Sequence, residues 1–321
     1  MVSPAASMST DPNPLKQLEN KFRSGQISKQ DYIRLMYRLH ERLFDYSSFI
    51  AGRNVDRITI TPEHVLVTTK EKVTMICSPD DWRITPVEIL NFGDYEMTET
   101  RLLLSFLTPE SVVVDVGANT GWYCITLGRA TPQGKVLAFE PIPQTVSWLR
   151  KNLALNAIAN VQIFEHGLSD ENKELVFYFH TRLSGATSAR DLLEGDDKIE
   201  VRAMVKRMDD VLAGEPRIDL IKCDVEGAEI FALRGGFETI RRTKPVLFVE
   251  MLRKWTAKYD YHPNEIIALM SGADYRCYSV EGGTLRHLEA MDENTAATNF
   301  FFLNADRHAE HIARFGHAAQ T

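Results

Sequence analysis

One stretch of the chain combines an acid, two glycines and an aromatic residue at the end of an apolar run. In "VVVDVGANTGWY", residues 112–123, Asp115 precedes Gly117 and Gly121 in a DxGxxxG pattern. A buried strand that breaks into a glycine turn lets the backbone approach a ligand, and the following helix can present free N–H groups to it. The stretch lacks GxGxxG and the GK[ST] of a phosphate-binding loop, so we expect a ligand other than a pyrophosphate.

Further polar residues follow other strand-like runs. They are Glu140 with Pro141, His166 with the Gly167–Leu168–Ser169 turn, Asp224 with Glu226, and Glu250. In an open parallel sheet, ligands bind beyond the carboxyl ends of the strands. We therefore expect these side chains to gather with the glycine turn at one edge of a sheet.

The acids at this edge indicate which ligand is bound. Asp115 suits an ammonium group, and an acid at Glu140 can accept hydrogen bonds from both hydroxyls of a ribose. A ligand with an amino group, a carboxylate and a sulfonium charge fits such a mixed site, which points to S-adenosylmethionine. An NAD-binding fold shares the acid at Glu140, so an NAD-dependent oxidoreductase remains the alternative.

Alternating strand-like and helical segments must position these residues. Strands are predicted at 111–116, 135–139, 161–165, 218–223 and 245–250, and helices at 121–130, 143–156 and 226–241. This alternation predicts an α/β fold with a parallel sheet covered by helices on both faces. The runs "ELVFYF" and "IEVRAMV" interrupt it and are typical of antiparallel strands around a polar loop.

The pattern divides the chain into four parts. We expect a disordered segment at 1–13, an extension of two helices and β-hairpins at 14–90, the main domain at 91–305 and a tail at 306–321. Helices are predicted at 14–24 and 28–46. Their apolar stripes could pack on the main domain or build a homo-oligomer.

Composition limits the classes of function. The chain has 321 residues, 44% of them hydrophobic, and a net charge of −7, which argues against nucleic acid as a main partner. Four isolated cysteines suit reduced thiols in a cytoplasmic protein. The first residues lack the pattern of a signal peptide, and no apolar run reaches the roughly 18 residues of a membrane helix.

Seven short motifs in order resemble one enzyme family. "VVVDVGANTGWY", "VLAFEPIP", "GLSD", "GATSA", "IDLIKCDVEGAE", "ALRGG" and "KPVLFVEM" are similar to the FkbM family of S-adenosylmethionine-dependent O-methyltransferases, over about residues 91–280. The resemblance implies a Rossmann-like class I methyltransferase fold with seven strands, the last antiparallel. It also implies methyl transfer to hydroxyls, often on sugars of glycans, polysaccharides or glycosylated natural products.

The resemblance also implies a cofactor site. Its residues are Asp115, Gly117, Asn119, Gly121, Tyr123, Glu140 and the turn Gly167–Leu168–Ser169. The stretch 183–191 reads as a surface loop or as a lid whose Ser188 touches cofactor or acceptor, and the resemblance favours the lid. Glu96 could close over the methionine end, although a helix start there is the plainer account.

Methyl transfer to an alcohol needs a base to take the proton. Asp224 is the first candidate, Glu226 and Glu250 come next, and His166 is a minor one. Asp224 reads equally as the N-cap of a helix. Asp224 and Glu250 could instead hold Mg²⁺, which would lower the pKa of bound sugar hydroxyls. A non-catalytic binding protein on the same fold is a further alternative.

Overall fold

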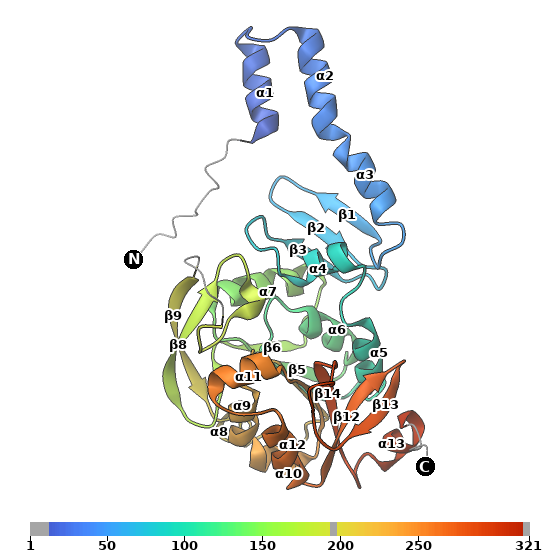
Figure 1. The fold of residues 1–321 in the computed structure, drawn as a ribbon, viewed down its shortest axis with the longest axis vertical. Coiled ribbons are helices and arrows are strands. Elements are labelled where there is room, and N and C mark those ends of the chain that lie inside the picture. Colours follow the sequence, from blue (N-terminus) through green and yellow to red (C-terminus); the bar gives the residue numbers. More distant parts are fainter. Residues whose placement is uncertain (1–12, 193–197, 317–321) are drawn as a thin grey trace. The chain divides into compact units, whose positions relative to one another are not determined.

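The structure, a computed structural model, describes residues 13–192 and 198–316. It divides into two compact units, residues 1–53 and 54–321 (Figure 1). The disorder expected at 1–13 falls, apart from Asn13, outside the described residues. The segment expected as a tail at 306–321 contains a helix, α13 (Ala309–Phe315).

The first unit is a helical hairpin that continues into a third helix. Its helices are α1 (Pro14–Arg23), α2 (Lys29–His40) and α3 (Arg42–Phe49), so the helix expected at 28–46 is interrupted at Glu41. Asn13 and Ser28 accept backbone N–H bonds at the starts of α1 and α2. The rings of Phe22 and Tyr32 stack at 4.6 Å and join the two helices.

A small antiparallel sheet begins the second unit. It consists of β1 (Arg57–Ile60), β2 (Val65–Thr68) and β3 (Thr74–Cys77). Asn152, in α7 (Pro143–Leu155), accepts a hydrogen bond from the N–H of Ile76 at 3.1 Å. Asn156, the C-cap residue of α7, accepts one from the N–H of Thr74 at 2.9 Å. These bonds tie the small sheet to the main domain, so the division lies after residue 53 and not at the expected 90/91 boundary.

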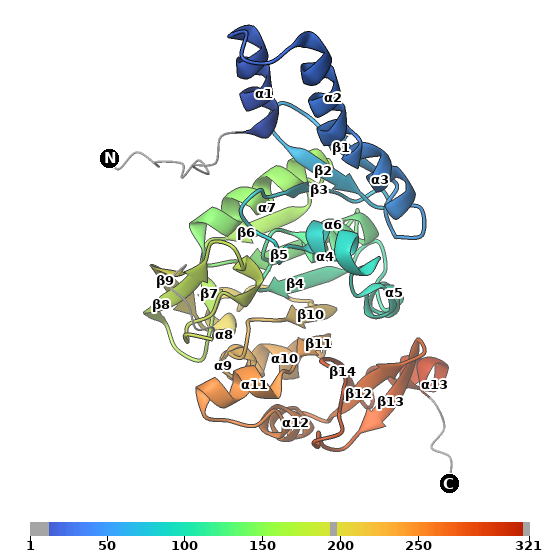
Figure 2. The same cartoon turned by 45° about the horizontal axis from the view of Figure 1, so that its top comes forward.

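The central sheet has eight strands in the order β13-β12-β14-β11-β10-β4-β5-β6 (Figure 2). Their bounds are β4 Val112–Val116, β5 Lys135–Phe139, β6 Val161–Phe164, β10 Leu220–Cys223, β11 Val246–Glu250, β12 Tyr275–Glu281, β13 Thr284–Leu288 and β14 Asn299–Asn304. The strands from β6 to β11 are parallel, which confirms the predicted α/β sheet.

The expected count of seven strands is wrong by one. β14 lies antiparallel between β11 and β12, as a closing strand should, but β13 adds an antiparallel edge strand. It forms because Gly282 and Gly283 both adopt positive φ (58° and 82°), which allows a tight hairpin between β12 and β13.

Helices connect the strands of this sheet. Besides α7 and α13, the helices of the second unit are α4 Thr85–Phe92, α5 Met97–Leu104, α6 Trp122–Ala130, α8 Met208–Val211, α9 Glu229–Gly235, α10 Phe237–Thr243, α11 Arg253–Thr256 and α12 Asn264–Ser271. The helix expected at 226–241 is therefore two helices, separated at Gly236, whose Cβ would lie 2.6 Å from the sulfur of Met208. No helix in the described ranges is long and apolar enough to cross a membrane.

A second small sheet carries the insertion. It contains β7 (Gly167–Leu168), β8 (Lys173–His180) and β9 (Lys198–Lys206), and β8 pairs antiparallel with β9 as predicted. A short 3₁₀ turn at Ser184–Ala186 follows β8.

Strand alternation separates the two faces of the central sheet. Val114, Ile221 and Leu247 belong to the apolar core that includes Ile230 of α9 and Ile266 of α12. Because neighbouring residues of a strand point to opposite faces, Asp115 and Lys222 face the other way, and the register pairs them directly across β4 and β10. A charged pair thus lies inside the sheet near its carboxyl edge.

Asn152 offers a test of how the small N-terminal sheet is held. Its side chain is 1% exposed, accepts from Ile76 N–H and donates to Thr120 C=O at 2.8 Å. Asn152→Ala leaves both backbone groups buried without these partners, so we expect the free energy of unfolding in urea to fall by roughly 2–4 kcal/mol. Asn20→Ala, at an exposed position of α1, is the control. A loss no larger than the control's would contradict this account.

Candidate active site

A cavity of about 430 Å³ opens at the carboxyl ends of β4, β5, β10 and β11. Its size is in the range of small-ligand sites. The expected site residues that line it are Glu96, Gly117, Asn119, Gly121, Tyr123, Glu140, Pro141, Asp224, Glu226 and Glu250. Ten residues from five separate segments thus meet where the sequence pattern placed them.

The glycine turn forms the floor of this cavity. Gly117 has φ 78°, and a Cβ there would lie 1.9 Å from the backbone oxygen of Asp224. Gly121 has φ 100°, and a Cβ there would lie 2.5 Å from Leu149. Both positions therefore require glycine for conformation and for space. Asn119 also adopts a left-handed conformation (φ 48°).

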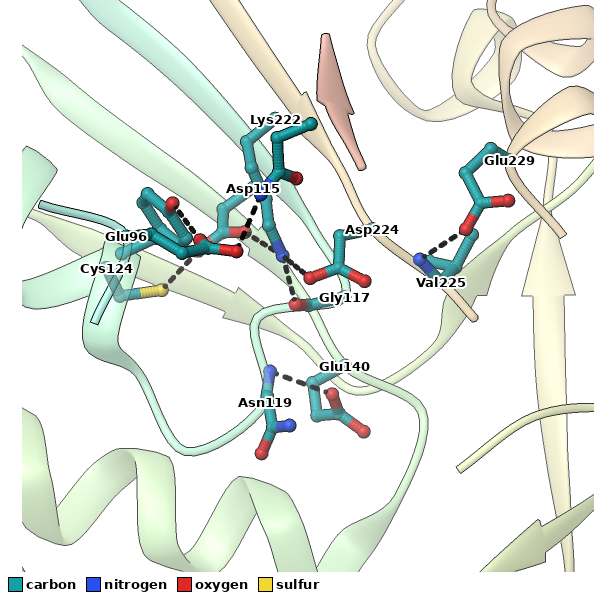
Figure 3. Close-up of polar contacts among 12 residues, drawn as sticks. Glu96, Asp115, Gly117, Asn119, Cys124, Glu140, Lys222, Asp224, Val225 and Glu229 are labelled. Atoms are coloured by element: carbon teal, nitrogen blue, oxygen red, sulfur yellow. Dashed lines mark hydrogen bonds and ion pairs between the residues drawn. The ribbon is translucent and has the colours of Figure 1, made fainter. Parts of the chain in front are cut away.

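Glu140 stands beside this turn and is 6% exposed. One carboxylate oxygen accepts from the N–H of Asn119 at 3.0 Å (Figure 3). The other accepts from the N–H of Ile142, also at 3.0 Å. Burial raises the pKa of Glu140 to about 7, despite these two bonds. A carboxylate has about four acceptor positions, so two remain for the hydroxyls of a ligand.

Asp115 occupies a different place from the one expected. It is fully buried, lies behind the cavity lining, and accepts a 3.2 Å bond from the thiol of Cys124. Its other oxygen lies 3.5 Å from the Nζ of Lys222. The ammonium that it faces therefore belongs to the protein, which corrects the expectation of a direct ligand contact. Burial, as the largest effect, raises the pKa of Asp115.

Lys222 is the site residue that sequence reasoning missed. It is 3% exposed, its Nζ donates to Gly117 C=O at 2.8 Å, and it lies 3.3 Å from Asp224 Oδ2 (Figure 3). Burial alone would lower the pKa of Lys222, but the carboxylates of Asp224 and Asp115 outweigh it and raise the pKa above its ordinary value. The sequence could have indicated this residue, because Lys222 is the one charged residue in the otherwise apolar strand "LIKC".

Three carboxylates gather in the cavity at the ends of β10 and β11. One oxygen each from Asp224, Glu226 and Glu250 lies within 4.8 Å of the others. Burial raises the pKa of Glu226 and of Glu250 well above the ordinary value, and the negative charge of Asp224 raises both further. Such a cluster can take up a proton from a neighbouring group or hold one cation.

The turn that carries Asp224 is shaped by Glu229, a second residue that was missed. Glu229 accepts the N–H groups of Val225 and Gly227, both at 3.0 Å. Glu226 and Gly227 have φ values of 54° and 96°, and α9 begins only at Glu229. Asp224 is therefore not the N-cap of that helix, and its side chain is free to meet Lys222.

Glu96 closes another side of the cavity. It adopts φ 45° just before α5, accepts from the hydroxyl of Tyr123, and accepts from Asn299 Nδ2 at 2.7 Å. Burial raises the pKa of Glu96. The residue thus joins α5, α6 and β14 and lines the cavity, and it stands at the start of α5, as the plainer interpretation expected.

Five other expected residues lie elsewhere. His166 packs beside Phe139, with ring centroids 5.4 Å apart, and its Nδ1 contacts Gly167 C=O. Gly167 and Leu168 form β7, Ser169 follows it, and none of the four residues lines the cavity. These four are structural because β7 pairs with β9 rather than joining the central sheet.

Ser188, the fifth, is a latch for the lid rather than a ligand contact. It is 1% exposed, and its hydroxyl bonds the backbone oxygen of Glu226 at 2.9 Å and the hydroxyl of Tyr259 at 2.6 Å. Residues 183–187, just before it, do line the cavity. The lid expected at 183–191 therefore contributes its first half to the site.

The cavity is rich in carboxyl groups. Over the described residues, six carboxylates line it against three cations: Glu88, Glu96, Glu140, Asp224, Glu226 and Glu250 against Arg83, Lys222 and Lys254. Like charges within a few ångströms repel, so this lining favours a ligand with positive charge over one with a pyrophosphate.

Known proteins share this part of the chain. At 34% identity over 149 residues, Methyltransferase 1 of Beauveria bassiana matches 39% of this chain and 58% of its own length. The 2-O-methyltransferase NoeI of Sinorhizobium fredii is 30% identical (45% and 65%), and the hexuronic acid methyltransferase AglP of Haloferax volcanii 29% identical (48% and 59%). The chain thus spans less than two thirds of the length of each of these relatives.

A solved structure, methyltransferase FkbM from Methylobacillus flagellatus, is 18% identical, with a TM-score of 0.40 over 61% of this chain and 44% of that one. The model of the methyltransferase FkbM domain matches residues 115–277, which is about half of the chain. This match begins at the buried Asp115 and includes Glu140, Lys222, Asp224 and Glu250. The chain therefore belongs to the FkbM methyltransferase family.

Proposed function

We propose that the protein is an S-adenosylmethionine-dependent O-methyltransferase that acts on a hydroxyl of a carbohydrate or glycosylated acceptor. The observation that carries this is the acid-rich cavity that Glu140 and the glycine turn share with the Asp224 cluster. Glu140 and the turn can hold a nucleoside, and the cluster can take a proton from an acceptor. The names of NoeI, a 2-O-methyltransferase, and AglP, a hexuronic acid methyltransferase, support oxygen and sugar as targets.

The described residues fit this cofactor. Glu140 has acceptor positions for the two ribose hydroxyls, and Gly117 and Gly121 leave backbone space that a Cβ would fill. Six lining carboxylates suit a sulfonium and an ammonium. The same charges disfavour the pyrophosphate of NAD, the cofactor of the alternative oxidoreductase.

S-adenosylmethionine supplies an activated methyl group, so the chain must align the acceptor and remove its proton. The hydroxyl oxygen forms a bond to the methyl carbon, the carbon–sulfur bond breaks with its electron pair staying on sulfur, and the hydroxyl proton passes to a carboxylate. Alignment can supply about 7–11 kcal/mol, and a placed base about 10²–10⁴-fold in rate.

Asp224 is the base in this proposal. Lys222 holds its Oδ2 at 3.3 Å, while its side chain, 31% exposed, still lines the cavity. The carboxylate is thus fixed through one oxygen and open through the other. Glu226 and Glu250 are the alternatives, because one carboxylate oxygen of each lies within 4.8 Å of an oxygen of Asp224 in the same cavity.

A divalent cation is the other candidate occupant of the three carboxylates. Mg²⁺ binds through oxygen ligands, and Asp224, Glu226 and Glu250 offer three close together. The base proposal needs no ion, since Lys222 already gives Asp224 a fixed cationic partner. Turnover that persists in EDTA supports the base, and turnover that is lost and then restored by Mg²⁺ supports the metal.

Part of the cavity lining suits a sugar. Trp255 contributes an aromatic ring, and Ser184 and Thr187 contribute small hydroxyl side chains. Carboxylates nearby can accept bonds from vicinal hydroxyls. A protein that binds such a ligand without methyl transfer is the remaining alternative, and a mass shift of the acceptor distinguishes the two.

Titration calorimetry with S-adenosylmethionine tests the cofactor. Ribose hydroxyls donate to the ionised carboxylate of Glu140, whose pKa is about 7. The ionised fraction falls about tenfold between about pH 8 and about pH 6, so we expect the contribution of Glu140 to affinity to fall by about as much. Glu140→Gln should weaken binding roughly tenfold or more at about pH 8 and flatten the pH dependence.

The same calorimetry separates the alternatives. NAD, titrated in parallel, should give no binding heat. Binding of NAD but not of S-adenosylmethionine would overturn the proposal. An unchanged Kd in Glu140→Gln would keep the cofactor but remove Glu140 from its site.

Asp224→Asn tests the base. We expect turnover, read as methylated acceptor by mass, to fall about 10²–10⁴-fold while the Kd for S-adenosylmethionine changes less than about threefold. Asp274→Asn is the control, because Asp274 is exposed and has a left-handed backbone that asparagine also adopts. Near-normal turnover in Asp224→Asn would move the role to Glu250 or Glu226.

A further inference from the structure

Lys222 is an ammonium group placed inside a sheet. It belongs to the four-residue strand β10, whose other members are apolar, and it is 3% exposed. Removing a charge from water costs several kcal/mol, and a buried pair is often replaceable by apolar side chains with no loss of stability. A purely structural need is therefore a weak explanation for a charge at this position.

The ammonium has three partners, one from each of three segments. They are Gly117 C=O in the glycine turn at 2.8 Å, Asp224 Oδ2 beyond β10 at 3.3 Å, and Asp115 Oδ1 on β4 at 3.5 Å (Figure 3). The contact with Gly117 is a hydrogen bond, and the contacts with the two carboxylates are ion pairs. Gly117 and Asp224 line the cavity, whereas Asp115 lies behind it.

The two cavity-lining partners belong to opposite halves of the proposed reaction. Gly117 is part of the turn that would hold the methyl donor, and Asp224 is the carboxylate that would take the acceptor's proton. Their backbones also touch, since a Cβ on Gly117 would lie 1.9 Å from Asp224 C=O. A displacement of either segment would therefore displace the other.

We infer that Lys222 is a positioning residue that fixes the glycine turn and the Asp224 carboxylate relative to each other, with Asp115 as its buried counterion. This inference rests on the proposed methyl transfer. In-line displacement depends on alignment, and a displacement of about 1 Å can cost about 10²-fold in rate. Lys222 thus acts through Gly117 and Asp224 rather than on the acceptor itself.

The register of the sheet explains how the arrangement is built. Lys222 pairs directly with Asp115 on β4 and with Phe248 on β11. Its Nζ lies 5.5 Å from the ring of Tyr123, so aromatic groups and carboxylates together surround the ammonium. The cation is confined to one position from which both sides of the cavity can be reached.

The test removes the charge without leaving a buried one unpaired. Lys222→Met alone would leave the buried charge of Asp115 without a counterion. The informative protein is therefore the double variant Lys222→Met with Asp115→Asn. We expect kcat to fall about 10²-fold, while the Kd for S-adenosylmethionine rises less than about fivefold. Lys222→Arg, which keeps the charge in a planar group, should recover only part of kcat.

A matched control is the pair Lys135 and Glu215, whose Nζ and Oε1 are 2.6 Å apart and which lie outside the cavity lining. Lys135→Met with Glu215→Gln should leave kcat unchanged. A kcat within about threefold of normal in the Lys222 and Asp115 double variant would show that Lys222 serves stability only, and would overturn the inference.

Amide hydrogen exchange gives a second readout that needs no turnover. In the double variant, the segments 117–121 and 224–227 should lose protection together, while β5 keeps its own. Unchanged exchange in both segments would overturn the inference. If the unmodified protein binds no S-adenosylmethionine, the proposed function fails, and the exchange result still decides whether Lys222 links the two segments.

Discussion

The whole site depends on a buried ammonium held between two carboxylates. Lys222 lies across from Asp115 in the sheet and reaches Asp224 beyond its own strand. Without this cation, the fully buried Asp115 would be an uncompensated charge, and the glycine turn would lose the donor to Gly117 C=O. The parallel register of β4 and β10 brings Lys222 beside Asp115. The strand pairing therefore also determines where the charges of the cavity lie.

The remaining acids differ in role because they differ in partners. Glu140 receives backbone N–H groups and suits hydroxyl donors, whereas Glu96 ties α6 to β14 through Tyr123 and Asn299. Within the described residues, the side chains of Glu226 and Glu250 accept no comparable hydrogen bonds, and burial beside Asp224 raises the pKa of each. Residues of one chemical type therefore differ in the groups that they contact and in the cause of their pKa shifts.

Much of this architecture could be predicted from the sequence. The apolar runs of β4, β5 and β11 and the acids that follow them indicated a parallel sheet with a ligand edge, because both signals are local. Asp115 was assigned to a ligand's ammonium because the pattern shows the acid but not its cross-strand partner. Lys222 and Glu229 were missed for the same reason, since their roles come from contacts made in three dimensions. Ser188 was expected to touch cofactor or acceptor, whereas its hydroxyl bonds the backbone oxygen of Glu226 and the hydroxyl of Tyr259.

Ser188 fixes its segment of the chain through contacts that depend little on neighbouring side chains. Its hydroxyl bonds the backbone oxygen of Glu226 and the hydroxyl of Tyr259, and a backbone oxygen is present whichever side chain stands at position 226. Residues 183–187, which line the cavity just before Ser188, can therefore change in sequence while this attachment and the glycine turn are kept. The shape of one part of the cavity lining can thus vary independently of the rest.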